Sequence, residues 1–235
     1  MKVLVVGATG GSGRAAVTEL VRRGHEVTAL SRHATALVTQ ADPALSGVRA
    51  VDGDATDPAV VGPLVAGQDA VVVTLGISES AVRVRLRGPA RTAPDVRSRG
   101  TRTVVDAMRT HGVRRLVVQT SYGVGETRDR LTAVTRLVFA VLLRPQIADT
   151  EIQHALVRAS GLDWLSVQPV NLTDGPADGM PFASVTGDVR GNTVPRARVG
   201  RFLAAAVDDD RWVGRTVALS GAADTPVRPA VRAQV

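Results

Sequence analysis

Short apolar runs alternate with helix-like segments along most of the chain. Each run is rich in β-branched residues and is apolar almost throughout, which is typical of strands buried on both faces of a sheet. Seven such runs predict seven strands. They are Lys2–Val6, Glu26–Leu30, Val48–Val51, Ala70–Thr74, Arg115–Gln119, Trp164–Gln168 and Thr216–Ser220.

The segments between these runs show helical periodicity. Alternation of strands with helices predicts an α/β fold, a doubly wound Rossmann-type parallel sheet flanked by helices. A small C-terminal portion is expected to complete a substrate pocket. The predicted helices are Gly13–Arg23, Pro58–Val65, Val96–His111, the markedly apolar Arg128–Leu143, Ala148–Ser160 and Arg201–Asp208.

No repeat or linker divides the 235 residues. We therefore expect a single domain over residues 1–221, followed by a tail at 222–235 that is rich in Pro, Ala and Arg and partly disordered. No apolar run approaches the roughly 18 residues of a membrane helix. The first residues lack a signal-peptide pattern, so a cytoplasmic protein without a membrane partner is expected.

Composition removes several function classes. The formal charge of +7 comes almost entirely from arginine, because Lys2 is the only lysine. The arginines are spread along the chain and aromatic residues make up only 3%, so we do not expect nucleic-acid binding. The absence of cysteine excludes disulfides and thiolate catalysis. No cluster of His, Asp and Glu has metal-ligand spacing, and we expect no metal.

The glycines of "VVGATGGSGR" follow the first predicted strand and precede a helix. Such a turn brings the backbone close to a pyrophosphate, and the helix N-terminus offers unpaired N–H groups to it. The sequence therefore predicts a dinucleotide site. Its first part consists of Gly7, Thr9, Gly10, Gly11, Ser12, Gly13 and Arg14.

The end of the second strand bears on the choice of nucleotide. An NAD site calls for an acidic residue about 20 residues beyond the glycines, which would bind the ribose hydroxyls. This chain has Ser31 and Arg32 there and no acid. A guanidinium suits a 2′-phosphate, so we expect NADP(H), although Arg32 as a solvated loop residue is the alternative.

The ends of the third and fourth strands add further candidates. Asp54, followed by Ala55, could accept a hydrogen bond from the adenine amino group or cap the helix that begins near Pro58. In open α/β sheets ligands collect at the carboxyl ends of strands. By the same rule Thr74, Leu75 and Gly76 are expected beside the ribose and pyrophosphate.

Together these motifs resemble those of the atypical short-chain dehydrogenase/reductase superfamily. The strings "GATGGSGR", "GDATD", "TSYGVG", "ASGLDW" and "QPVNLTDG" occur in the order and spacing of its NmrA-like and biliverdin-reductase-B or flavin-reductase-like branch. The resemblance covers about residues 1–221. It implies an NAD(P)H-dependent oxidoreductase, with Thr120, Pro169, Val170 and Asn171 near the nicotinamide.

The chain departs from the family at its catalytic positions. Ordinary members use a Tyr followed four residues later by a Lys; here Tyr122 is followed by Glu126, and no lysine is available. Related sequences place Lys, Glu and Arg where this chain has Thr150, His154 and Gln168. A cationic contact to cofactor or substrate is therefore missing.

Three residues remain as candidates for chemistry. Ser121 could orient a substrate carbonyl. Tyr122 could donate its hydroxyl with a pKa near the ordinary value of about 10, or simply pack under its loop. His154 could act as an acid or base, although a lone helical histidine is more often structural.

An arginine-rich segment, Arg83–Arg99, follows the fourth strand. It is expected either to be a solvated loop, to cover an acidic or phosphate-bearing substrate, or to meet a protein partner. The apolar helix Leu131–Leu143 would form a pocket wall or a dimer face, so both a monomer and a homodimer are open.

The leading functional hypothesis is an NADPH-dependent reductase of a conjugated small molecule, such as a flavin, a quinone or a polyketide-like enone of specialised metabolism. A stabilised anion can take its proton from solvent, so such a substrate does not need the Tyr–Lys pair. The alternatives are an NADP(H)-sensing regulator without turnover and a redox-neutral dehydratase or cyclase on a reductase scaffold.

Overall fold

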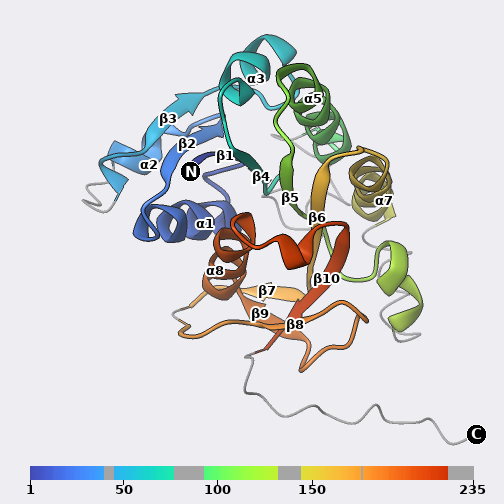
Figure 1. Ribbon diagram of the computed structural model, residues 1–235. Helices are drawn as coiled ribbons and strands as arrows, with labels where there is room; N and C mark the ends of the chain where they lie inside the picture. Colours follow the sequence, from blue (N-terminus) through green and yellow to red (C-terminus); the bar gives the residue numbers. More distant parts are fainter. Residues whose placement is uncertain (40–44, 77–92, 132–143, 176, 222–235) are drawn as a thin grey trace, which may run out of the picture.

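The sheet of the protein has eight strands, and all but one are parallel to their neighbours (Figure 1). The computed structural model describes residues 1–39, 45–76, 93–131, 144–175 and 177–221. The strand order is β3-β2-β1-β4-β5-β6-β10-β8, and β8 is antiparallel to β10. The bounds are β1 Lys2–Val6, β2 Glu26–Ser31, β3 Arg49–Asp52, β4 Ala70–Val73, β5 Arg115–Gln119, β6 Asp163–Pro169, β8 Phe182–Ser184 and β10 Arg215–Ser220.

Helices cover both faces of this sheet (Figure 1). Alternate residues of β1 show why: Val3 and Val5 join one apolar cluster, whereas Leu4 and Val6 join the other. The first cluster includes residues of α1 (Gly11–Arg22) and α8 (Arg196–Val207). On the opposite face lie α3 (Pro58–Val65), α5 (Val96–His111) and α7 (Arg144–Arg158). This is the predicted doubly wound architecture.

Close packing of α1 on α8 depends on a glycine inside the later helix. A Cβ added at Gly200 would lie 2.5 Å from the carbonyl carbon of Ala15 and 2.6 Å from the nitrogen of Ala16. Both are backbone atoms that cannot rotate away. The glycine therefore sets how closely α8 approaches α1, and α1 is the helix that follows the glycine-rich turn.

Several boundaries agree with the sequence prediction, and others do not. The ranges of β1, β5, α3 and α5 are as predicted. In contrast, α8 begins at Arg196 and not at Arg201. The short elements α2 (Thr35–Thr39), β7 (Asn171–Thr173) and β9 (Thr193–Pro195), together with β8, were not predicted.

Some predictions fall on parts of the chain outside the described residues. For the predicted helix Arg128–Leu143, the structure shows a 3₁₀ helix over Gly125–Arg130, and residues 132–143 are not described. Residues 83–92 of the arginine-rich segment and the tail at 222–235 are also outside the description. Within the described ranges, every helix is too short or too polar to cross a bilayer.

Candidate functional site

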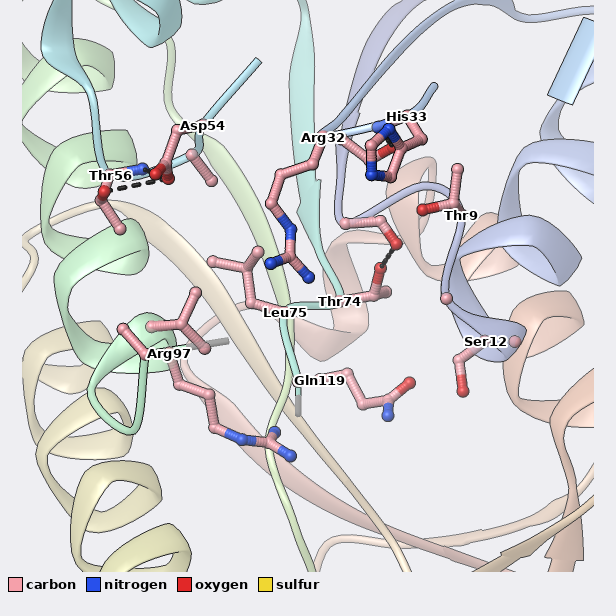
Figure 2. A pocket seen from close by; sticks show the side chains of 18 of the residues that line it. Thr9, Ser12, Arg32, His33, Asp54, Thr56, Thr74, Leu75, Arg97 and Gln119 are labelled. Atoms are coloured by element: carbon pink, nitrogen blue, oxygen red, sulfur yellow. Dashed lines mark hydrogen bonds between the residues drawn. The ribbon is translucent and has the colours of Figure 1, made fainter. Parts of the chain in front are cut away.

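A cavity of about 730 Å³ opens at the carboxyl ends of the central strands (Figure 2). The strand order reverses between β1 and β4, and ligands of doubly wound sheets bind at such a point. The volume is within the range of small-molecule sites. The lining residues come from both halves of the sheet: Gly7, Thr9, Gly10, Gly11, Ser12, Ser31, Arg32, His33, Gly53, Asp54, Ala55, Thr56, Thr74, Leu75, Gly76, Ala93, Val96, Arg97, Arg99, Gln119, Leu172, Asp174 and Arg196.

The glycine-rich turn has the geometry that the sequence predicted for it. Gly7 has a φ of 87°, and a Cβ there would lie 2.9 Å from the carbonyl of Thr74. Thr74 is buried, and its hydroxyl donates to the carbonyls of Val6 and Gly7 at 3.2 Å. A Cβ at Gly13 would lie 2.3 Å from the Gly7 carbonyl oxygen. The turn, α1 and the end of β4 are therefore packed backbone against backbone.

The N-terminus of α1 is open toward the cavity. Its N-cap residue is Gly10, no side chain caps the helix, and its first turn contains no acidic residue. The hydroxyl of Ser12 is buried without a hydrogen-bond partner and lines the cavity. Uncapped N–H groups at a helix N-terminus attract anions. This end of α1 therefore fits a pyrophosphate, which Ser12 could also bind.

The end of β2 forms the next part of the wall. The hydroxyl of Ser31 accepts a hydrogen bond from the His33 N–H at 3.3 Å. Arg32 lines the cavity, and Figure 2 shows its guanidinium projecting into it. Arg14 is exposed on α1 and does not line the cavity.

Asp54 lies at the end of β3 and faces the same cavity. One of its carboxylate oxygens accepts from the backbone N–H and the hydroxyl of Thr56, at 2.8 and 2.9 Å. The N-cap of α3 is Asp57, which accepts from the Ala59 N–H at 2.9 Å. The capping role considered for Asp54 thus belongs to Asp57, and Asp54 remains a candidate for adenine.

The wall at the ends of β4 and β5 contains two further polar residues. The sequence reasoning missed Gln119, whereas Arg97 belongs to the segment Arg83–Arg99, for which contact with an acidic or phosphate-bearing substrate was one expected role. Gln119 ends β5, and its side-chain oxygen is buried without a partner. Arg97 lies in the first turn of α5, and its Nε is also buried without a partner. A search for polar residues at every strand end and every helix start on this side of the sheet would have found both.

The residues that follow β5 were expected near the nicotinamide and the substrate. None of the three, Thr120, Ser121 and Tyr122, is among the residues that line the cavity. The Tyr122 hydroxyl donates to the Gly187 carbonyl at 3.0 Å. Burial raises the pKa of Tyr122, so the expectation of an ordinary value was wrong. This hydroxyl is bonded within the protein and is a weak acid.

His154 is placed inside the protein, only 3% exposed. Its Nδ1 lies 3.0 Å from the Ser166 hydroxyl and its Nε2 lies 2.9 Å from a carboxylate oxygen of Glu126. Arg158 pairs with the other oxygen of Glu126 at 2.7 Å. Burial acts to raise the pKa of Glu126, but a backbone hydrogen bond and the charges of His154 and Arg158 outweigh it and lower that pKa. His154 therefore holds the Glu126 loop to β6 and does not reach the cavity.

The other two departures from the family pattern are also buried. The Thr150 hydroxyl donates back to the Gln146 carbonyl of its own helix at 2.7 Å. The side chain of Gln168 accepts from Thr127 at 2.6 Å and donates to the Val124 carbonyl at 2.9 Å. Where related sequences have charged residues, this chain has neutral side chains bonded inside the fold.

The segment after β6 contributes different residues from those expected. Pro169 accepts from the Tyr122 N–H at 3.1 Å, and Val170 donates to the Leu219 carbonyl at 3.0 Å, so both hold the loop in place. Neither they nor Asn171 line the cavity. Leu172, Asp174 and Arg196 do.

Arg196 lies directly over the glycine turn. A Cβ at Gly11 would lie 2.4 Å from its Cδ. Its guanidinium pairs with Asp174 at 2.7 Å. This pair closes the cavity on the side of α8.

Comparison with known families gives one match over most of the chain. The model of a family described as NAD(P)H-binding matches residues 7–210. The matched range contains every residue that lines the cavity.

Solved structures with the same fold span nearly the whole chain. ChuY of Escherichia coli O157:H7, described as an anaerobillin reductase, is 23% identical with a TM-score of 0.71, and the match covers 98% of this chain and 100% of that one. The oxidoreductase YlbE of Lactococcus lactis is 19% identical, with a TM-score of 0.71 and coverage of 94% and 92%. A short-chain dehydrogenase/reductase of Veillonella parvula is 15% identical, with a TM-score of 0.72 and 98% coverage of both chains.

The family match confirms a nicotinamide dinucleotide as cofactor, and the solved structures confirm the predicted doubly wound fold. The geometry agrees with that cofactor, because the uncapped helix, the glycines and the unpartnered Ser12 hydroxyl form a cradle for its phosphates.

Proposed function

We propose that this chain, which belongs to the NAD(P)H-binding family, is an NADPH-dependent reductase of a conjugated small molecule such as a flavin, a quinone or an enone. The observation that carries the proposal is the pairing of an open α1 N-terminus with Arg32, which projects into the same cavity. The first accounts for a pyrophosphate and the second for a 2′-phosphate.

The preference for NADPH over NADH rests on the end of β2. Asp or Glu at this position would bind ribose hydroxyls, but the residues that line the cavity here are Ser31, Arg32 and His33. A guanidinium can donate two parallel hydrogen bonds to a phosphate. Arg32 is therefore proposed as the residue that selects the phosphorylated cofactor.

The proposed class of substrate follows from the lack of a histidine, tyrosine or lysine among the described lining residues beyond β4. The bound cofactor supplies the hydride, and the residues of the chain orient it and shield it from water. The Tyr122 hydroxyl is bonded to Gly187 and His154 is bonded within the core. The lining residues beyond β4 include Gln119, Arg97 and Leu172, none of which titrates near neutral pH. A conjugated acceptor suits such a site, because solvent can protonate the stabilised anion.

One structural neighbour supports this class of substrate. ChuY is described as an anaerobillin reductase. At 23% identity that activity is not transferred to this chain, but it fits a reductase that acts on conjugated systems.

Turnover is tested by mixing the protein with NADPH and FMN, menadione or a panel of enones, and by following the absorbance of the reduced nicotinamide. We expect oxidation of NADPH with at least one of these acceptors. Tight NADPH binding without oxidation by any of them would refute the reductase and favour the sensing role. The supporting observation for that role is that the described lining residues beyond β4 include no histidine, tyrosine or lysine.

The cofactor preference is tested with Arg32→Asp. We expect the ratio of the NADH and NADPH dissociation constants to fall by about tenfold or more, because one charged hydrogen-bonding partner is lost and a repulsive charge is gained. The matched control is Arg49→Asp, which makes the same charge change on the exposed first residue of β3, outside the cavity. An unchanged ratio in Arg32→Asp would refute the assignment.

A further inference from the structure

Arg97 is a cation that lines the same cavity. It lies in the first turn of α5, the first helix described after β4. In doubly wound sheets the two halves of a dinucleotide lie on opposite sides of the point where the strand order reverses. Arg32 and the glycine turn belong to β2 and β1, whereas Arg97 belongs to the half built on β4, β5 and β6.

A buried carboxylate binds the backbone at the start of α5. The two oxygens of Asp149, on α7, accept from the N–H groups of Arg97 at 3.0 Å and of Ser98 at 3.2 Å. Asp149 therefore caps α5. The helix N-terminus is satisfied by this carboxylate, and it is the Arg97 side chain that remains available to a ligand.

The guanidinium of Arg97 has no hydrogen bond or ion pair with the other described residues, and its Nε is fully buried. Burial lowers the pKa of Arg97, and the nearby charge of Asp149 opposes that effect. An arginine nevertheless keeps its charge in a protein. A cation that has a buried nitrogen and no bonded partner among the described residues is costly unless an anion joins it.

The surroundings of this guanidinium are suited to a ligand. A Cβ at Gly76 would lie 3.3 Å from Nη2 of Arg97, so the glycine gives the charged group room at the end of β4. The side-chain oxygen of Gln119, also buried and unpartnered, lines the same cavity. Figure 2 shows the Arg97 and Gln119 side chains entering the cavity from neighbouring elements.

We infer that Arg97 binds the carboxylate or phosphate of the substrate, and therefore that the conjugated substrate is an anion. The inference deepens the proposed function and rests on it for the identity of the ligand as a substrate. The planar fork of an arginine fits a carboxylate or phosphate through two parallel hydrogen bonds. The cofactor phosphates have their own partners at the α1 N-terminus and at Arg32, on the other half of the sheet.

Equilibrium binding tests this without requiring turnover. The protein is saturated with NADP⁺, and FMN and riboflavin are titrated by flavin fluorescence. The two ligands share the ring system and differ in one phosphate. A second pair, anthraquinone-2-carboxylate and its methyl ester, is titrated by ligand absorbance. We expect the dissociation constant of at least one anion for the wild type to be about tenfold lower than that of its neutral partner. A ratio of this size corresponds to one hydrogen bond to a charged group.

In Arg97→Gln that preference should disappear, with the affinity for the neutral partner and for NADPH unchanged. Arg97→Lys should restore part of it. The matched control is Arg102→Gln, which removes the same charge from an exposed position of the same helix and should keep the preference. Equal thermal melting of the variants shows that the fold is intact.

Three results would overturn the inference. The wild type could show no preference for either anion, Arg97→Gln could retain the preference, or Arg97→Gln could weaken NADPH binding and leave the preference intact, which would assign Arg97 to the cofactor. Failure of the proposed function looks different: NADPH is not oxidised by any acceptor, yet the anion preference is still present and still lost in Arg97→Gln.

Discussion

Replacement of Gly13 by alanine tests the packing that shapes the dinucleotide turn. The added Cβ would lie 2.3 Å from the Gly7 carbonyl oxygen and 2.7 Å from the Thr74 hydroxyl oxygen. Real Cβ atoms do not approach so closely. The nearer atom belongs to the backbone of the turn, so relief requires α1 to move away from β1 and β4.

The size of the effect follows from two opposing terms. Overpacking of a rigid site costs up to about 3 kcal/mol, and alanine in place of glycine inside a helix returns about 1 kcal/mol. We expect the free energy of unfolding to fall by about 2 kcal/mol, a drop in Tm of about 4–8 °C for a chain of this size. Displacement of the turn should also weaken NADPH binding, by about tenfold.

Gly62→Ala is the matched control, because Gly62 also lies within a helix, α3, and a Cβ there meets nothing within 4 Å. It should keep or raise Tm and leave NADPH binding unchanged. Thermal melting and fluorescence titration of NADPH measure both variants. If Gly13→Ala melted with the wild type and bound NADPH equally well, the account of the turn as a backbone-to-backbone contact would be refuted.

Two further predictions concern the framework around the site. Gly200→Ala should lower the free energy of unfolding by about 2 kcal/mol, because its Cβ would meet backbone of Ala15 and Ala16; a melting temperature equal to that of the wild type would show that α8 can move away from α1 freely. Because the pKa of Glu126 is lowered in the folded state from its ordinary 4.5, its contribution is full above that value and is lost as the pH falls through the folded pKa. Glu126→Gln should therefore be less stable than the wild type by about 1 kcal/mol at pH 7, and denaturant unfolding should show this gap closing as the pH falls from about 5 to 3; a gap independent of pH would contradict the ionic role.

The sequence predicted the parallel core and the geometry of the glycine-rich turn well, because both depend on neighbouring residues. The β1 and β5 runs are apolar on both faces, and α3 begins at a proline after Asp57, which are signals carried by neighbouring residues. The elements that the sequence did not predict depend on contacts between segments far apart in the chain. The strands β7 and β9 have three residues each, too few for periodicity to show, and they form because they pair with one another.

The same division applies to the site. The glycines, Ser31, Arg32 and Asp54 were identified because they follow strands directly, and strand ends meet at one edge of a parallel sheet. Gln119 ends β5, so the same rule would have found it, whereas Arg97 and Arg196 lie at helix starts, where this rule does not apply. Arg97 enters the cavity because Asp149 caps the backbone of α5 and Gly76 leaves room for the guanidinium. Both residues are distant from Arg97 in the sequence.

By itself, therefore, the sequence determined the doubly wound sheet, the glycine-rich turn and the lack of a Tyr–Lys pair, because each depends on residue types and on spacings along the chain. The tertiary structure decided which groups are available for chemistry. It bonds Tyr122 to Gly187 and His154 to Ser166 and Glu126, and it leaves Arg97 in the cavity without a bonded partner among the residues it describes. Those outcomes depend on contacts between segments far apart in the chain, and such contacts exist only after the layers have packed.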